Sequence, residues 1–338
     1  MCKILNNLNT NAISLSTYSN ENNKLDYTIN LASKSSNLDC NFFIDDFYYE
    51  KEQNSNFISY RNNLLKLISH ILKKYDYRLE NINAKLKECN NKDIYKLYGE
   101  LITANLYKIP KFYNADKIEL ENYYDNNSIL LIPLDNTISI ANNAKKYFKK
   151  YNKLKNALEI VSLQKIETEE ELQYIESIIY ELEYAKDIQE VNEIYNEITE
   201  NPIFKDFLQN SKVSNKKDSN SSTPREFHID GYTVLVGKNN KQNDYLTTKI
   251  ASKNDIWFHT KDIHGSHVIL KNPASNVSNE ILIKCAKLAA YYSKARLSNN
   301  VPVDYCLVKY VKKPNGSKPG MVIYTNNKTL NVTPCEFN

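Results

Sequence analysis

A repeat of apolar residues every seven positions dominates the first half of the chain. Two apolar residues in each heptad match the a and d positions of a coiled coil, which predicts one long helix. The first set is Ile58, Leu65, Leu72, Leu79 and Leu86, and the second is Ile68, Tyr75, Ile82 and Cys89.

A second repeat of the same kind follows further along the chain. Its members are Tyr147, Leu154, Val161, Ile175 and Leu182, interleaved with Tyr151, Leu158, Leu172 and Ile179. Two long helices joined by a compact insert form most economically an antiparallel hairpin within one chain. Lys165 and Thr168 place polar side chains in this seam, so the pattern also permits pairing between two chains.

The remaining patterns divide the chain into regions. Within the helical region 46-200, the insert 94-143 contains a helix stop at Pro110 and the strand-like SILLIPL, and we expect it to cap the far end of the hairpin. Residues 1-45 lack a self-sufficient hydrophobic pattern and read as a remnant of a preceding region. Residues 201-226, rich in Ser, Asn and Lys, read as a linker.

Short alternating strands follow in residues 227-338, including YTVLVG, DIWFH, SHVIL and KTLNV. Ser278 is a candidate N-cap for a helix with an apolar stripe from Ile281 to Ala295. We therefore expect an α+β chain: a long antiparallel coiled-coil hairpin with a small capping insert, followed by a compact mixed α/β domain.

Charge is distributed unevenly between the two halves. From Arg225 onward 16 Lys and Arg stand against 8 Asp and Glu, giving +8, whereas residues 1–224 hold 28 against 32, giving −4. A basic domain is typical of proteins that bind nucleic acid. The six cysteines show no CxxC spacing, which predicts reduced thiols in a cytoplasmic protein. The lack of a long apolar run predicts no membrane partner.

The segment from Gly237 to Leu270 gathers the only tryptophan and three of the five histidines. Its polar start, KNNKQND, predicts a loop presented to solvent, because Lys and Asn donate to phosphates and base edges and aromatic rings stack on unpaired bases. An alternative for Trp257 is an ordinary core position, since DIWFH alternates. The candidate RNA-binding residues are Lys238, Asn240, Lys241, Asn243, Trp257, His259, His264, Ser266 and His267, joined by Lys312 and Lys313 near a PNG turn.

Catalysis is not expected from these residues. Three histidines at positions 259, 264 and 267 could in principle form a zinc triad, but no acidic general base has the spacing of a metallohydrolase. The Gly231 and Gly237-Lys238 pair has the wrong spacing for a phosphate-binding loop. The prediction is therefore a binding protein with no catalytic residue, metal or cofactor.

Several motifs resemble the NFACT family. GKNNKQND, DIWFH, GSHVIL, AYYSKAR and the run from NVPVDYC to GMVIY are similar to its RNA-binding NFACT-R domain, and FYYEK, IYKLYGELITANLY, NYYD, IPLD and NAKKYFKKYNKLK are similar to its coiled-coil middle domain. The resemblance implies that residues 227-338 are an NFACT-R domain and that most of the family's amino-terminal NFACT-N domain is missing from this chain. No tRNA-contacting residue of that missing part is transferred.

The resemblance also implies a function and partners. Members of the family act in ribosome quality control: they bind large (50S) ribosomal subunits with a stalled nascent chain, and tRNA, and promote template-free alanine tailing. The implied partners are the 50S subunit, tRNA (alanyl-tRNA), and ribosomal proteins near the tip of the arm. Other family members are named for fibronectin binding, so a surface adhesin is the alternative.

Overall fold

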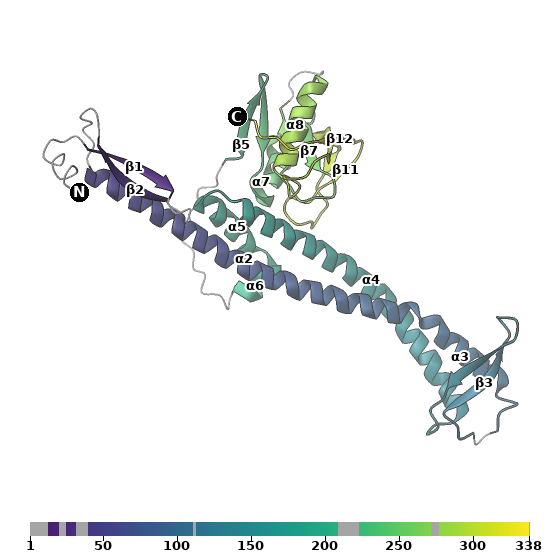
Figure 1. The fold of residues 1–338 in the computed structure, drawn as a ribbon. Helices are drawn as coiled ribbons and strands as arrows, with labels where there is room; N and C mark the ends of the chain where they lie inside the picture. Colours follow the sequence, from purple (N-terminus) through teal and green to yellow (C-terminus); the bar gives the residue numbers. More distant parts are fainter. Residues whose placement is uncertain are drawn as a thin grey trace.

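The computed structural model describes residues 13–19, 25–31, 40–110, 113–208, 223–271 and 277–337. A long two-helix arm carries a small tip at one end, and a sheet domain sits on the arm nearer its other end (Figure 1). The α+β class expected from the sequence is confirmed.

The arm consists of α2 (Cys40–Asn90) and α4 (Ile140–Tyr184), which lie side by side and run in opposite directions (Figure 1). The predicted antiparallel hairpin is thus confirmed. An ion pair of 3.3 Å between Arg78 and Glu171 shows which positions of the two helices lie opposite each other. Ile58 departs from the predicted seam, because it is 47% exposed. At this stagger, the position opposite Ile58 lies beyond the end of α4.

The base of the arm is thickened by α5 (Ile188–Glu200) and α6 (Pro202–Leu208). Their apolar residues, including Ile194 and Phe204, join one core with Ile68 of α2 and Ile178 of α4. Part of the expected linker is therefore a packed helix. Proline is favoured at the start of a helix, and the Phe204 side chain is fully buried. Residues 209–222 of that linker lie outside the described residues. Its last two residues, Arg225 and Glu226, already belong to the first strand of the sheet domain, so that domain begins earlier than expected.

The tip combines α3 (Lys92–Asn105) with an antiparallel hairpin of β3 (Lys117–Asn122) and β4 (Ser128–Pro133). Leu101, Ile102, Ile118 and Ile132 form its core. The insert lies at the far end of the arm, where we expected a cap (Figure 1).

The sheet domain contains a six-stranded antiparallel sheet in the order β12-β9-β7-β8-β6-β5. Its strands are β5 (Arg225–Ile229), β6 (Tyr232–Val236), β7 (Ile256–Thr260), β8 (Val268–Leu270), β9 (Val301–Leu307) and β12 (Lys328–Val332). A small ladder pairs β10 (Val311–Lys312) with β11 (Ile323–Tyr324).

Alternation along β7 places neighbouring residues on opposite faces of this sheet. Ile256 and Phe258 pack under α8 (Asn279–Tyr291), whose N-cap is Ser278 as predicted. Trp257 packs on the other face with Leu246, Ile269 and Cys306. The second face of the sheet therefore carries a smaller apolar core.

The amino-terminal part of the chain contains an antiparallel hairpin of β1 (Ile13–Ser19) and β2 (Leu25–Leu31). The side chains of residues 1–43 lie outside the described part of the structure. The expected remnant character of residues 1-45 stays a prediction.

Candidate nucleic-acid interface

The polar segment KNNKQND forms a short helix rather than a presented loop. Asn239 caps α7 (Asn240–Tyr245) by accepting a 2.9 Å hydrogen bond from the Gln242 backbone N–H, and a π-helical turn (Leu246–Ile250) follows. The side chains of Asn239, Asn240, Gln242 and Asn243 are buried. The expectation of a solvent-facing loop is therefore wrong.

Burial of this segment is possible because the arm supplies hydrogen-bond acceptors. Glu193 of α5 accepts from the Asn239 amide at 2.8 Å and from the Gln242 amide at 3.1 Å. Asn240 donates to the Ser177 hydroxyl of α4 at 2.9 Å. Buried polar groups are tolerated when they are hydrogen-bonded in this way. The polar segment thus joins the sheet domain to the base of the arm.

Both candidate lysines of this segment form ion pairs with α5. Lys238 lies 3.6 Å from Glu190, which also binds Arg225 at 3.0 Å, and all three side chains are largely buried. Lys241 lies 2.6 Å from Glu200 in a more exposed pair. Acidic residues that recur every three or four positions therefore give α5 a negative face, on which the basic segment docks.

One of the two candidate lysines near the PNG turn contacts the polar segment itself. Lys313 forms an ion pair of 2.7 Å with Asp244 at the end of α7. Lys312 is exposed on β10. The structure therefore does not bring Lys312 and Lys313 into the same site as the histidines.

The three histidines gather around β7 and the loop that follows it. The His259 ring is nearly parallel to the Trp257 ring, with centroids 5.7 Å apart, and His267 meets both rings edge-on. The His267 ring lies 2.7 Å from the Thr247 hydroxyl, and the His267 backbone N–H donates to the side-chain oxygen of Asn243 at 2.9 Å. His264 reaches across to Glu176 of α4 at 3.1 Å.

Burial keeps two of these imidazoles uncharged at neutral pH. It lowers the pKa of His259 to about 4, and it lowers the pKa of His267 to about 3, with a further contribution from His259. Within the described residues, no three His, Cys, Asp or Glu side chains are placed to hold a metal ion.

Trp257 occupies the core position that alternation allowed. Its side chain is fully buried, and its indole N–H has no hydrogen-bond partner among the residues that the structure describes. A base cannot stack directly on this ring while the rings around it stay in place. His259, which is partly exposed and covers Trp257, is the accessible ring of the pair.

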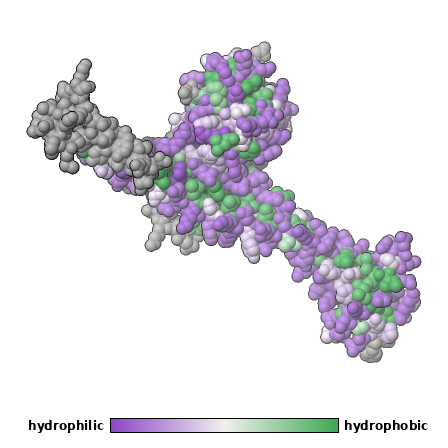
Figure 2. Space-filling model, viewed as in Figure 1, coloured by the Kyte–Doolittle hydropathy of each residue, from purple (hydrophilic) through white to green (hydrophobic). Residues whose placement is uncertain are grey.

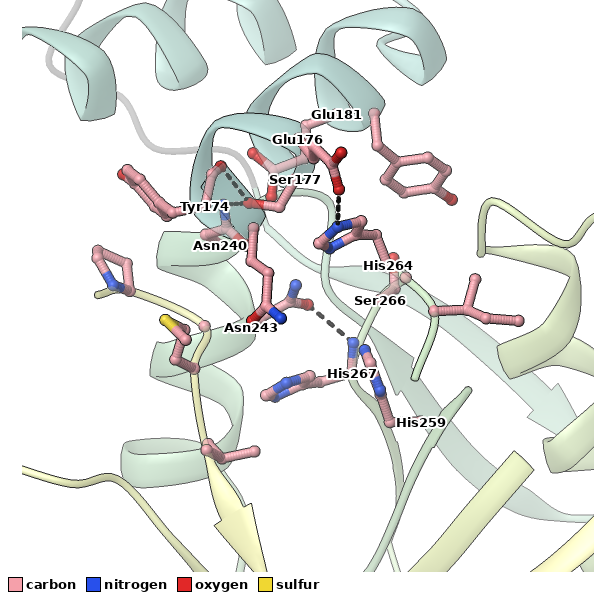
Figure 3. A pocket seen from close by; sticks show the side chains of 18 of the residues that line it. Tyr174, Glu176, Ser177, Glu181, Asn240, Asn243, His259, His264, Ser266 and His267 are labelled. Carbon is pink, nitrogen blue, oxygen red and sulfur yellow. Dashed lines mark hydrogen bonds and ion pairs between the residues drawn. The ribbon is translucent and has the colours of Figure 1, made fainter. Parts of the chain in front are cut away.

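A cleft of about 450 Å³ separates these residues from α4 of the arm (Figure 3). The candidate residues that line the cleft all belong to the sheet domain: Lys238, Asn240, Asn243, Trp257, His259, His264, Ser266 and His267. The structure therefore brings most of the candidates together, with Lys241, Lys312 and Lys313 outside.

Sequence reasoning missed the opposite wall, which α4 supplies with Tyr174, Glu176, Ser177, Tyr180 and Glu181. A signal for it was present. Tyr174 and Ile178 are apolar in the sequence but lie outside the predicted seam, and both are buried. Such a wide buried face indicates contact with more than one partner helix.

Two carboxyl groups are buried beneath this wall. Glu197 of α5 accepts a 2.7 Å hydrogen bond from Tyr174. Within the described part of the chain, one oxygen of Glu181 and one of Glu197 have no hydrogen-bond partner. Burial raises the pKa of Glu181 well above its ordinary range, nearby Glu197 raises it further, and the Asn240 backbone opposes this. Burial likewise raises the pKa of Glu197.

Comparison with known proteins identifies the two parts of this arrangement. Residues 1–220 match the NFACT N-terminal and middle domains, and residues 225–326 match the NFACT protein RNA binding domain. The chain belongs to the NFACT family. The sheet domain is thus the NFACT RNA-binding domain, and the arm lies within the match to the N-terminal and middle domains.

Curated relatives of this NFACT chain share its sequence over most of its length. A protein named Rqc2 homolog RqcH from Bacillus subtilis is 38% identical over 86% of this chain and 50% of the relative. Its counterpart from Streptococcus suis is also 38% identical, over 86% of this chain and 51% of the relative. The chain spans about half the length of these relatives.

A solved structure has the same fold as this NFACT chain. It is the C-terminal part of the fibronectin/fibrinogen-binding protein from Streptococcus suis, 33% identical, with a TM-score of 0.63 over 83% of this chain and 96% of that one. In the part of the chain that the structure describes, no helix is long and apolar enough to cross a membrane.

Proposed function

We propose that this chain acts in ribosome quality control by binding large (50S) ribosomal subunits that carry a stalled nascent chain, together with tRNA, and by promoting template-free alanine tailing. The observation that carries the proposal is the match of both NFACT regions, in order, to relatives named Rqc2 homolog RqcH. In this role the chain positions RNA in the cytoplasm and catalyses no reaction itself.

The distribution of charge supports a division of labour within the chain. The RNA-binding domain has a net charge of +8 from Arg225 onward, against −4 for the rest. Two of its lysines, Lys238 and Lys241, form ion pairs with α5 and are thereby withdrawn from RNA. The remaining lysines supply the attraction to phosphate.

The tip of the arm offers a second contact surface. Ile129 and Leu131 are 72% and 47% exposed on the outer face of β4, and Tyr107 and Tyr124 are exposed at the same end. Figure 2 shows hydrophobic residues gathered on the visible face of the tip. Exposed apolar patches of this kind favour protein contacts, and we assign this one to a ribosomal protein.

Sedimentation tests the proposal. The 338-residue chain is mixed with purified 50S, 30S and 70S particles at two salt concentrations. Salt-sensitive co-sedimentation with 50S particles is the expected result, because phosphate contacts weaken as salt rises. Absence of binding to 50S particles at both concentrations contradicts the proposal for this part of the protein.

Two variants separate the tip from the RNA-binding domain in the same assay. Replacing Ile129 and Leu131 with lysine should weaken 50S binding, because it removes the apolar surface without touching the tip core. Replacing Glu119 and Glu121, which face them across the hairpin, with glutamine is the control on the same surface. If the lysine variant binds 50S particles as well as the glutamine control and the unaltered chain do, the tip is not part of the contact.

A second candidate function is adhesion to fibronectin. It is favoured by the similarity to the Streptococcus suis fibronectin/fibrinogen-binding protein. Fibronectin is therefore a parallel ligand in the sedimentation experiment. Binding to fibronectin without binding to 50S particles would support adhesion and overturn the ribosomal proposal.

A further inference from the structure

The cleft between the RNA-binding domain and α4 has the size of a small-ligand site. Its volume is about 450 Å³, which is within the usual range for sites that bury one small molecule or one end of a larger one. Figure 3 shows side chains from both walls, with Glu176 and Ser177 above and His264 and His267 below. A ligand in this cleft contacts the arm and the RNA-binding domain together.

One wall of the cleft provides a flat, uncharged ring. His259 lies parallel over the buried Trp257, at an interplanar angle of 13°, and is itself partly exposed. The low pKa of His259 keeps the imidazole neutral at physiological pH. Such a stack of two rings favours a flat aromatic ligand on its open side.

The charges of the lining exclude phosphate from the interior. Among the described lining residues Lys238 is the only lysine or arginine, and Glu190 already neutralises it at 3.6 Å. The carboxyl groups of Glu176 and Asp262 also line the cleft. Glu181 lines it too, but its raised pKa favours the uncharged acid. These groups and the amides beside them favour a ligand that donates hydrogen bonds.

The rim of the cleft has the opposite character. Lys261 and Lys318 each directly precede a lining residue, and the Lys294 backbone N–H donates to the backbone carbonyl oxygen of His264 at 2.9 Å. Within the described part of the chain, none of these three lysines belongs to an ion pair, in contrast with Lys238 and Lys241. Anionic groups are therefore favoured outside the cleft and disfavoured within it.

We propose that the cleft receives one unpaired nucleobase with an exocyclic amine, such as adenine or cytosine, from single-stranded RNA. The base stacks on His259, its amine donates to Glu176, and the flanking phosphates contact Lys261, Lys294 and Lys318. This inference rests on the proposed function, because that function supplies the RNA. Uracil lacks the amine and is the disfavoured base.

Trp257 reports on this binding because it is the only tryptophan and lines the cleft. The full chain is titrated with short single-stranded homopolymers of riboadenosine, ribocytidine and ribouridine while tryptophan fluorescence is recorded. We expect saturable changes with the first two and about tenfold weaker binding of the third, as loss of one charge-assisted hydrogen bond requires. Equal affinity for all three overturns the base preference.

Variants test stacking and amine recognition separately. His259→Ala should weaken binding of every homopolymer, whereas His259→Phe should retain it, because the ring remains. Glu176→Gln keeps the shape of the side chain and should reduce the preference for riboadenosine over ribouridine. Thermal unfolding monitored by circular dichroism confirms that each variant is folded. Unchanged binding by folded His259→Ala contradicts the site.

The rim lysines have a different signature. Changing Lys261, Lys294 and Lys318 to serine should weaken all three homopolymers alike and lower the slope of log affinity against log salt by about 2. Changing Lys145, Lys149 and Lys153, which are exposed on the arm, to serine is the matched control. An equal change of slope in both triple variants overturns the assignment of the rim.

Two further ligands identify the source of the base. If His259→Ala weakens tRNA binding alone, the base comes from tRNA; if it weakens 50S binding alone, the base comes from ribosomal RNA. Normal binding of tRNA and 50S by His259→Ala and Glu176→Gln would overturn the cleft site and leave the proposed function standing. If the unaltered chain itself binds neither tRNA nor 50S particles, the proposed function is overturned instead.

Discussion

Glu190 forms ion pairs with Arg225 at 3.0 Å and with Lys238 at 3.6 Å, so one carboxylate joins helix α5 to strand β5 and to the segment that follows strand β6. Its side chain is only 6% exposed, and both basic partners are largely buried. The contact between the arm and the sheet domain is therefore centred on a buried group of charges. Removing one member of such a group is strongly destabilising, because the remaining charges stay buried without a partner.

Glu190→Ala should destabilise the chain by about 3 kcal/mol, because Arg225 and Lys238 then stay buried without their acceptor. Lys241→Ala, which removes the exposed pair with Glu200, is the control and should cost less than about 1 kcal/mol. Urea denaturation measures both. Equal effects would mean that burial does not distinguish the two pairs.

Trp257→Ala should lower the free energy of unfolding by about 3–5 kcal/mol, as expected for removal of a large core aromatic. Trp257→Phe should cost considerably less, since it keeps a ring and eliminates the indole N–H that lacks a partner. Circular dichroism in denaturant provides the comparison. A stable Trp257→Ala variant would contradict the core position.

Acid should destabilise the sheet domain through His259 and His267. Their folded-state pKa values, about 4 and about 3, lie below the ordinary 6.5. The stability that comes from keeping them neutral is present above pH 6.5 and is lost as pH falls toward these values. His267→Gln should flatten the decline between pH 6.5 and 4, measured by Trp257 fluorescence in urea. An unchanged slope would exclude His267 from this response.

Glu181 should produce the opposite dependence. Its folded-state pKa is raised, so its contribution is fully present below the ordinary value of 4.5 and is lost as pH rises. Glu181→Gln should therefore be more stable than the unaltered chain at neutral pH and should lose that advantage near pH 4. Glu183→Gln, an exposed change on the same helix, is the control. Thermal melting at several pH values measures both variants. If Glu181→Gln is no more stable than the unaltered chain at neutral pH, burial of the Glu181 carboxyl is not the cause of this dependence.

Local patterns were sufficient to predict the arm and the faces of the sheet. The heptad spacing requires only that two helices pack along one seam, and Ile68, Cys89, Leu154 and Ile175 are buried as it predicts. Ile58 continues the same spacing but is exposed, because the length of α4 decides where the seam ends. That length is not encoded near Ile58.

The polar segment illustrates what local patterns do not contain. Asn239, Asn240 and Gln242 are polar, and on that ground alone they are expected in solvent. Their acceptors, Ser177 and Glu193, lie 46 or more positions away in the sequence. Only the fold brings donors and acceptors together, and so the second wall of the cleft was missed as well.

The antiparallel pairing of α2 and α4 places the tip far from the RNA-binding domain (Figure 1). With 45 residues, α4 extends for about 67 Å at about 1.5 Å per residue. A rotation of about 5° at the base therefore displaces the tip by about 6 Å, more than the diameter of a water molecule. A small rotation of the arm about the Glu190 contact therefore produces a large displacement of the tip.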